Sequence, residues 1–176
     1  MHYLLECEAS RHKRGKNVVR HAVTALRDAR KRPLLPLELG ALSFWQAARR
    51  RGIRLFISLP SYHVLQRRRH YKEALVFLKF SEVLSPTRYH TRWARRIRET
   101  SKLSREDAAM IALATFGRDS SGPILGVPKL ITYDLPMING YQKKYLSLEH
   151  RLQAMTAQLD PPFDKGADTL ISQSRG

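Results

Sequence analysis

The segment SREDAAMIALATF, residues 104–116, decides most of what this sequence predicts about its fold. Ser104 followed by the acids Glu106 and Asp107 is a capping-box pattern, in which side chains satisfy the free backbone N–H groups at the start of a helix. All six residues from Ala108 to Leu113 are apolar, so a helix here has no solvent-facing stripe. The sequence therefore predicts a helix that is buried on most of its sides.

Around this helix, apolar patterns with strand and helix periods alternate along the chain. The clearest strand pattern is at residues 53–59, where every second residue is a Leu or an Ile. The expected strands are 2–7, 53–59, 81–85 and 129–133, and the expected helices are 17–30, 38–51, 60–79, 87–100, 104–116 and 141–158. Such alternation is typical of a parallel sheet covered by helices on both faces. The predicted fold class is α/β, a three-layer α/β/α arrangement with a small, mainly parallel central sheet.

The length and the C-terminal composition indicate how the chain is divided. A chain of 176 residues suits one domain and is long enough to bury a core. Residues 158–176 contain Pro161, Pro162 and Gly166 and show no apolar period. We therefore expect one domain over residues 1–157 and a disordered tail over residues 158–176.

The chain is strongly basic, with 32 Lys and Arg residues against 15 Asp and Glu residues and a formal net charge of +17. Hydrophobic residues make up 43% of the sequence, so the charge belongs to a folded protein. RNA or another nucleic acid is the partner that such a charge most directly indicates. The alternative is a set of solvated helix faces. Arginines in two basic runs are the candidate nucleic-acid-binding residues: Arg67, Arg68, Arg69, Arg92, Arg95 and Arg96.

Several classes of protein are excluded by simple features. A lone cysteine, Cys7, cannot form an intramolecular disulfide or a multi-cysteine zinc site. The longest apolar stretch, Ala108–Phe116, is about half the ~20 residues that a membrane span needs. The first ten residues already contain Glu6 and Glu8, unlike the apolar part of a secretion signal. We expect a soluble, cytoplasmic protein that does not enter a membrane.

Two carboxylates stand at places where an α/β sheet builds its ligand site. Asp107 lies in the opening turn of the buried helix, and Asp134 directly follows the strand expected at 129–133. In a parallel sheet such positions converge at one edge. Carboxylates held close together repel each other unless a divalent cation neutralises them. Mg²⁺ or Mn²⁺ suits oxygen ligands and activates water for attack on a phosphodiester.

With these two motifs, Glu106-Asp107-Ala108 and Thr132-Tyr133-Asp134, and with its order of elements over about residues 1–145, the chain resembles the PIN-domain ribonucleases, which include many toxin nucleases. The resemblance implies an acidic site that holds Mg²⁺ or Mn²⁺ and cleaves RNA, with Asp107 and Asp134 as catalytic metal ligands. Glu6 stands near the place of the family's first-strand aspartate and is expected to complete the site. Thr132 is expected to position Asp134 by hydrogen bonding.

The resemblance is incomplete, which leaves two functions open. The family's glutamate early in the helix after the second strand is missing, and this chain has His63 and Gln66 near that place. One hypothesis is a divalent-metal endoribonuclease. The other is a PIN-fold module without activity that binds RNA or another nucleic acid through its basic surface. Asp107 as a helix cap and Asp134 as a turn residue are the competing structural interpretations. A protein partner, either antitoxin-like or a second copy, is a further open question.

Overall fold

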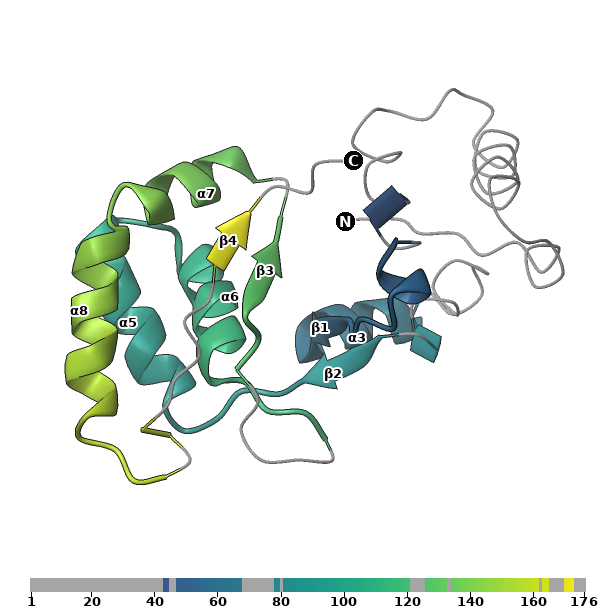
Figure 1. Cartoon of the computed structure of the whole chain (residues 1–176), viewed down its shortest axis with the longest axis horizontal. Coiled ribbons are helices and arrows are strands. Elements are labelled where there is room, and N and C mark those ends of the chain that lie inside the picture. The colour runs from purple at the N-terminus through teal and green to yellow at the C-terminus, as the bar shows by residue number, and fades with distance from the viewer. Residues whose placement is uncertain are drawn as a thin grey trace, which may run out of the picture. The chain divides into compact units, whose positions relative to one another are not determined.

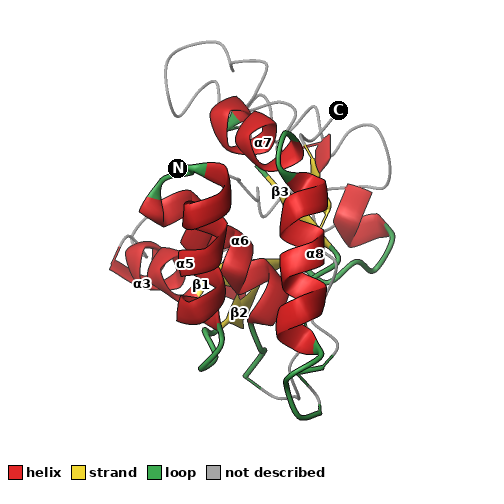
Figure 2. Ribbon diagram, turned by 90° about the vertical axis from the view of Figure 1, so that its left-hand side faces the viewer, coloured by secondary structure: helices red, strands yellow, loops and turns green. Residues whose placement is uncertain are grey.

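The computed structural model describes residues 43–44, 47–67, 78–79, 81–120, 126–132, 134–161, 163–164 and 170–172. The chain divides into two compact units, and Figure 1 labels the helices and strands of their described parts. Unit 1 is Met1–Glu82 with Ser174–Gly176, and unit 2 is Val83–Gln173. Helices make up most of the described residues, and the strands are short (Figure 2). The elements expected at 2–7 and 17–30 lie outside the described residues.

Unit 1 contains a short strand that leads directly into a helix. Strand β1 is Phe56–Ser58, and helix α3 is Leu59–Arg67. The backbone N–H of Ser61 donates to Ser58 Oγ at 3.2 Å, so Ser58 caps the helix. Pro60 in the first turn needs no N–H partner there. This cap and this proline explain why the strand ends at Ser58, whereas the apolar alternation predicted a strand as far as residue 59.

The core of unit 2 is formed by four helices. They are α5 (His90–Ser101), α6 (Arg105–Phe116), α7 (Leu135–Gln142) and α8 (Tyr145–Thr156). Helix α5 packs against both α6 and α8, and α8, α5 and α6 follow one another across Figure 1. The largest fully buried side chains are Trp93, Phe116, Ile97, Ile111, Leu148 and Met155. The prediction that α6 is buried on most sides is confirmed, since all residues from Ile111 to Phe116 are buried.

The two ends of α6 follow from its sequence. At the start, the backbone N–H of Asp107 donates to Ser104 Oγ at 3.1 Å, as the capping-box pattern predicts. At the end, the N–H of Gly117 donates to the Leu113 carbonyl at 2.7 Å. A Cβ atom at Gly117 would lie 2.5 Å from Leu84 Cγ and would also meet the Leu113 carbonyl oxygen. Only glycine therefore fits where the chain leaves this helix.

Unit 2 also contains a small parallel sheet. Strand β3 is Lys129–Ile131, and strand β4 is Leu170–Ser172. They pair in parallel with Leu130 opposite Ile171. Helix α6 packs against β3, and α7 packs against β4. The structure is thus a mixture of helices and strands with a parallel pair, in agreement with the α/β class at this level.

Two elements differ from the sequence-based expectation. Helix α7 occupies a segment where Pro136 suggested a turn, because Asp134 caps the helix and the proline fits its first turn. The helix expected at 141–158 is α8, which begins at Tyr145 and is separated from α7 by Lys143 and Lys144. Strand β4 lies in the stretch expected to be a disordered tail. Three residues are too few to show an apolar period, and their pairing with β3 depends on a segment far away in the sequence.

Candidate functional site

Asp107 lies in the first turn of α6, and its side chain is half-buried. Its backbone N–H is satisfied by Ser104, and its carboxylate forms no ion pair with any residue that the structure describes. The positive end of the helix dipole favours a carboxylate at this position. Asp107 is thus placed as a helix-start acid, which is the position that the sequence predicted.

Asp134 is the N-cap of α7. Its Oδ1 accepts a hydrogen bond from the backbone N–H of Met137 at 3.0 Å. Its own backbone N–H donates to Thr132 Oγ1 at 3.1 Å. Thr132 therefore holds the backbone of Asp134, and the cap fixes one carboxylate oxygen. The other oxygen belongs to an exposed residue and can face an incoming ligand.

Asp107 lies in the first turn of α6, and Asp134 lies between the end of β3 and the start of α7. Strand β3 ends on the side at which α6 begins, and α7 lies along this side (Figure 1). A Cβ atom at Gly140 in α7 would lie 2.6 Å from Leu103 Cδ2, so α7 packs closely beside the residue that precedes Ser104. Asp134 lies six residues before Gly140, or about 9 Å along the helix axis at 1.5 Å per residue. Convergence of the two carboxylates stays a prediction.

The chemistry of this pair bears on the expected divalent cation. Two carboxylates are hard oxygen ligands of the kind that Mg²⁺ and Mn²⁺ prefer. Within the described ranges, however, no three His, Cys, Asp or Glu side chains are grouped so that they could hold a metal ion. Glu6, the expected third ligand, lies outside these ranges. The described residues by themselves do not fit the three-acid site that the resemblance implies.

The positive charge is distributed unevenly between the units. Unit 1 carries 19 Lys and Arg residues against 6 Asp and Glu residues, whereas unit 2 carries 13 against 9. Unit 1 therefore accounts for +13 of the net charge of +17. Such an excess cannot be neutralised by ion pairs within unit 1 and favours an anionic partner.

One acid of unit 1, Glu82, is already paired. Arg54 donates to its two carboxylate oxygens from Nε at 2.7 Å and from Nη2 at 2.5 Å. Three other arginines, Arg50, Arg51 and Arg67, are exposed and form no ion pair with the described residues. Their guanidinium groups remain available to a ligand. Arg68 and Arg69, predicted with Arg67 to bind nucleic acid, lie outside the described residues.

Helix α5 carries the second predicted group of arginines. Trp93 and Ile97 face inward and are buried, which confirms Trp93 as a core residue. Arg92 and Arg95 are exposed, and Arg96 is half-buried. Arg95 and Glu99 form an exposed ion pair at 3.8 Å, one helical turn apart. Such pairs contribute about 0.5 kcal/mol or less, so Glu99 holds Arg95 only weakly.

An arginine that the sequence-based prediction left out stands just before this helix. The guanidinium of Arg88 lies over the ring of Tyr89, 4.8 Å from its centroid, and over the ring of Phe163, 5.3 Å from its centroid. Phe163 is 75 residues further along the chain, so no local pattern could reveal this contact. The sequence showed only that Arg88 and Tyr89 begin a basic segment. Phe163 lies in residues 158–176, which were expected to be disordered.

Comparisons with known proteins found no family model, curated protein or solved structure that matches the chain. In the part of the chain that the structure describes, no helix has both the length and the apolar character needed to cross a membrane.

Proposed function

We propose that this protein binds RNA through exposed basic residues, and that unit 1, which carries most of the net charge, is the main contributor. The observation that carries the proposal is the excess of 19 basic over 6 acidic residues in unit 1, where Glu82 is already engaged by Arg54. Phosphate groups accept hydrogen bonds from guanidinium groups and release their counterions when arginines neutralise them. Exposed arginines on both units support this function without requiring a catalytic site.

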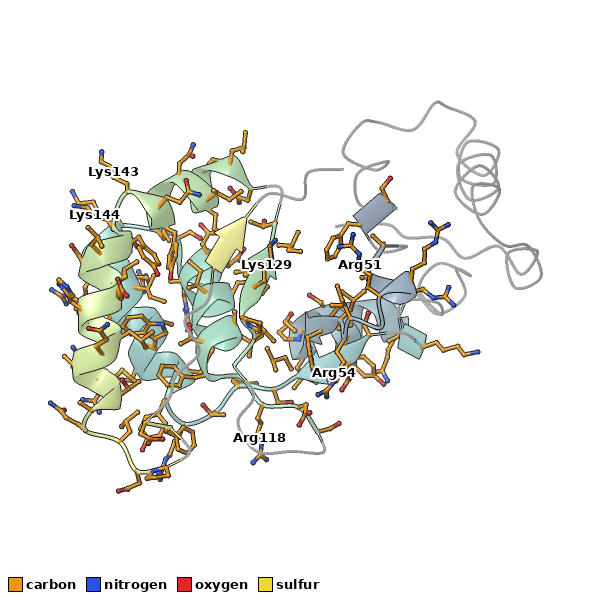
Figure 3. The ribbon with its side chains drawn as sticks, viewed as in Figure 1. Arg51, Arg54, Arg118, Lys129, Lys143 and Lys144 are labelled. Carbon is orange, nitrogen blue, oxygen red and sulfur yellow. The ribbon has the colours of Figure 1, made fainter. Side chains whose placement is uncertain are left out.

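The experiment measures binding of a fluorescently labelled single-stranded RNA to the full chain at several KCl concentrations. A variant with Arg50→Gln, Arg51→Gln and Arg67→Gln removes three exposed charges from unit 1. The matched control removes three exposed charges from unit 2 through Lys129→Gln, Lys143→Gln and Lys144→Gln; Figure 3 shows Lys143 and Lys144 at the corner between α7 and α8.

The two variants should differ in the slope of log affinity against log salt. Each lost phosphate contact makes that slope shallower by ~0.7 for a single strand. The slope of the unit 1 variant, which lacks three charges, should therefore be shallower by about 2. The control should keep the slope of the unaltered protein. Equal losses in both variants would mean that only net charge matters, and salt-independent binding would overturn the proposal.

A second candidate function is cleavage of the bound RNA by a PIN-like, three-layer domain. Two observations at Asp134 favour it. Thr132 fixes the backbone of Asp134, and the cap of α7 uses only one of the two carboxylate oxygens of Asp134. Asp107 lies at the start of α6, and α6 begins on the side of unit 2 at which β3 ends. Under this proposal Asp107 and Asp134 would contribute oxygen ligands to Mg²⁺ or Mn²⁺, and the ion would supply an activated water for attack on the phosphodiester.

Cleavage is tested with labelled RNA and Mn²⁺, with and without a chelator, for the unaltered chain and for Asp134→Asn. Asparagine is as good an N-cap as aspartate, so this variant keeps the start of α7 while it removes the charge. Cleavage that stops with chelator and in Asp134→Asn supports the nuclease. If the protein binds RNA but does not cleave it with any divalent cation, it is a binding module without nuclease activity.

A further inference from the structure

The contact between Arg88, Tyr89 and Phe163 joins two distant segments at the surface of unit 2. The rings of Tyr89 and Phe163 lie edge to face with centroids 4.5 Å apart, and Tyr89 also contacts Phe116 of α6. Both rings are half-buried against the core, whereas Arg88 is exposed. The aromatic pair is therefore a fixed support, and the arginine is the part of the cluster that meets solvent.

A second arginine stacked on a ring shows what is unusual about Arg88. Arg54 lies 5.0 Å over the ring of Phe56, but its charge is also paired with both oxygens of Glu82. Arg88 also stacks on aromatic rings, but it pairs with no carboxylate among the described residues. Asp160 and Asp164, which flank Phe163, form no ion pair with it, although all of these residues are described. The two rings thus restrain the Arg88 guanidinium, which forms no ion pair with the described residues.

The position of Arg88 continues the arginines of α5. Arg92 follows it by four residues and Arg95 by seven, which is the spacing of one helix face. The backbone from Thr87 already turns into the helix, since the N–H of His90 donates to the Thr87 carbonyl at 3.1 Å and that of Trp93 to the Tyr89 carbonyl at 2.9 Å. Trp93 and Ile97 face inward, which leaves this row facing solvent.

We propose that Arg88 is a phosphate-binding residue, held on the rings of Tyr89 and Phe163, and that it anchors RNA to the α5 face of unit 2. This inference rests on the proposed RNA binding and extends it beyond unit 1. A free arginine side chain loses much conformational freedom when it binds, and a side chain already held on aromatic rings loses less. A planar guanidinium can then donate two hydrogen bonds to one phosphate.

The first test compares Arg88→Gln with Arg151→Gln, which removes an exposed charge from α8 of the same unit. Binding of the same labelled single-stranded RNA is measured against KCl concentration with the full chain. Arg88→Gln should make the slope of log affinity against log salt shallower by ~0.7. If the variant and the unaltered protein bind equally at 1 M KCl, the variant should bind about eightfold more weakly at 50 mM KCl. Arg151→Gln should leave the slope unchanged. If the unaltered protein binds with a steep slope but the two variants are equal, the role of Arg88 is wrong while RNA binding stands.

The second test asks whether Phe163 acts through Arg88. Phe163→Leu should weaken binding roughly two- to tenfold when Arg88 is present, because the guanidinium loses its support. It should have no effect in the Arg88→Gln background. Phe163→Tyr keeps a ring and should bind like the unaltered protein, which separates loss of stacking from damage to the fold. Weaker binding in both backgrounds would indicate that Phe163 itself contacts a base, and tighter binding would indicate that the acidic segment around it blocks the surface; either result overturns the proposal.

Discussion

The cap that Asp134 provides for α7 can be separated experimentally from its proposed role as a metal ligand, because the cap needs an oxygen acceptor but not a charge. Asp134→Ala removes the bond to the Met137 N–H and should lower the free energy of unfolding by about 1 kcal/mol. Asp134→Asn should stay within a few tenths of a kcal/mol of the unaltered protein. Urea denaturation of the three proteins measures this. Equal losses in both variants would show that the charge, and not the cap, stabilises α7.

Gly117 is a second residue at which the structure makes a specific demand. A methyl group there would meet the Leu113 carbonyl and the Leu84 side chain. Gly117→Ala should therefore cost about 1–3 kcal/mol in the free energy of unfolding, because the packed neighbours must shift.

Gly52 provides the control for Gly117→Ala. It has a φ of 64°, but nothing lies within 4 Å of a Cβ placed there. Gly52→Asn should change the free energy of unfolding by no more than about 0.5 kcal/mol, since Asn tolerates this backbone region. If Gly117→Ala proved as harmless as Gly52→Asn in urea denaturation, the close approach at the end of α6 would be wrong.

Part of the candidate site could be anticipated residue by residue. Ser104 and Asp107 were assigned to a capping pattern, and the N–H of Asp107 does bond to Ser104. The role of Thr132 was expected as a hydrogen bond to Asp134, and the bond is made to its backbone N–H. The support of Arg88 by Phe163 could not be anticipated, because local spacing carries no information about partners so far apart.

At the scale of elements, the contact between α5 and α6 is the main packing in unit 2. Ile97 of α5 and Ile111 of α6 are both completely buried. Ile111→Ala should lower the free energy of unfolding by about 2–5 kcal/mol, since it loses buried area and leaves a cavity. Met110→Ala, at a neighbouring residue that is 38% exposed, should cost at most about 1 kcal/mol. Similar losses in the two variants would contradict the orientation of α6.

An element could be predicted when residues close together in the sequence determine it, and not when its partner lies far along the chain. Helices α5 and α6 were anticipated because their inward faces recur at helical spacing, and α6 also has the Ser104 cap at its start. Helix α7 was missed because Pro136 suggested a turn, although an aspartate followed closely by a proline is also a helix start. Strand β4 was missed because its stability comes from pairing with β3.

At the scale of the whole molecule, charge dominates the expected behaviour. If about five phosphates of a single strand are neutralised, the slope of log affinity against log salt is about −3.5. Raising KCl fourfold, from 50 to 200 mM, should then weaken RNA binding roughly a hundredfold. Fluorescence anisotropy across this range measures the change. A decrease of less than about threefold would correspond to roughly one phosphate contact and would exclude an extended basic surface.

The charge of the molecule and its basic runs were evident from the sequence, but their division between two units was not. The division after Glu82 places most of the net charge in unit 1. The expectation of one domain over residues 1–157 stays a prediction. Periodicity describes segments and does not show which segments pack together. For the same reason, the expectation that Glu6 joins Asp107 and Asp134 stays a prediction.

The parallel pairing of β3 with β4 has a consequence for biosynthesis. Strand β4 begins at Leu170 and is made only after α7 and α8, so the edge of β3 that it covers has no partner while the ribosome adds the intervening residues. At about 5–20 residues per second this interval lasts roughly 2 to 8 seconds. Unpaired strand edges attract other chains. During this interval the open edge of β3 can pair with another chain, and a chaperone that shields extended segments would prevent such pairing.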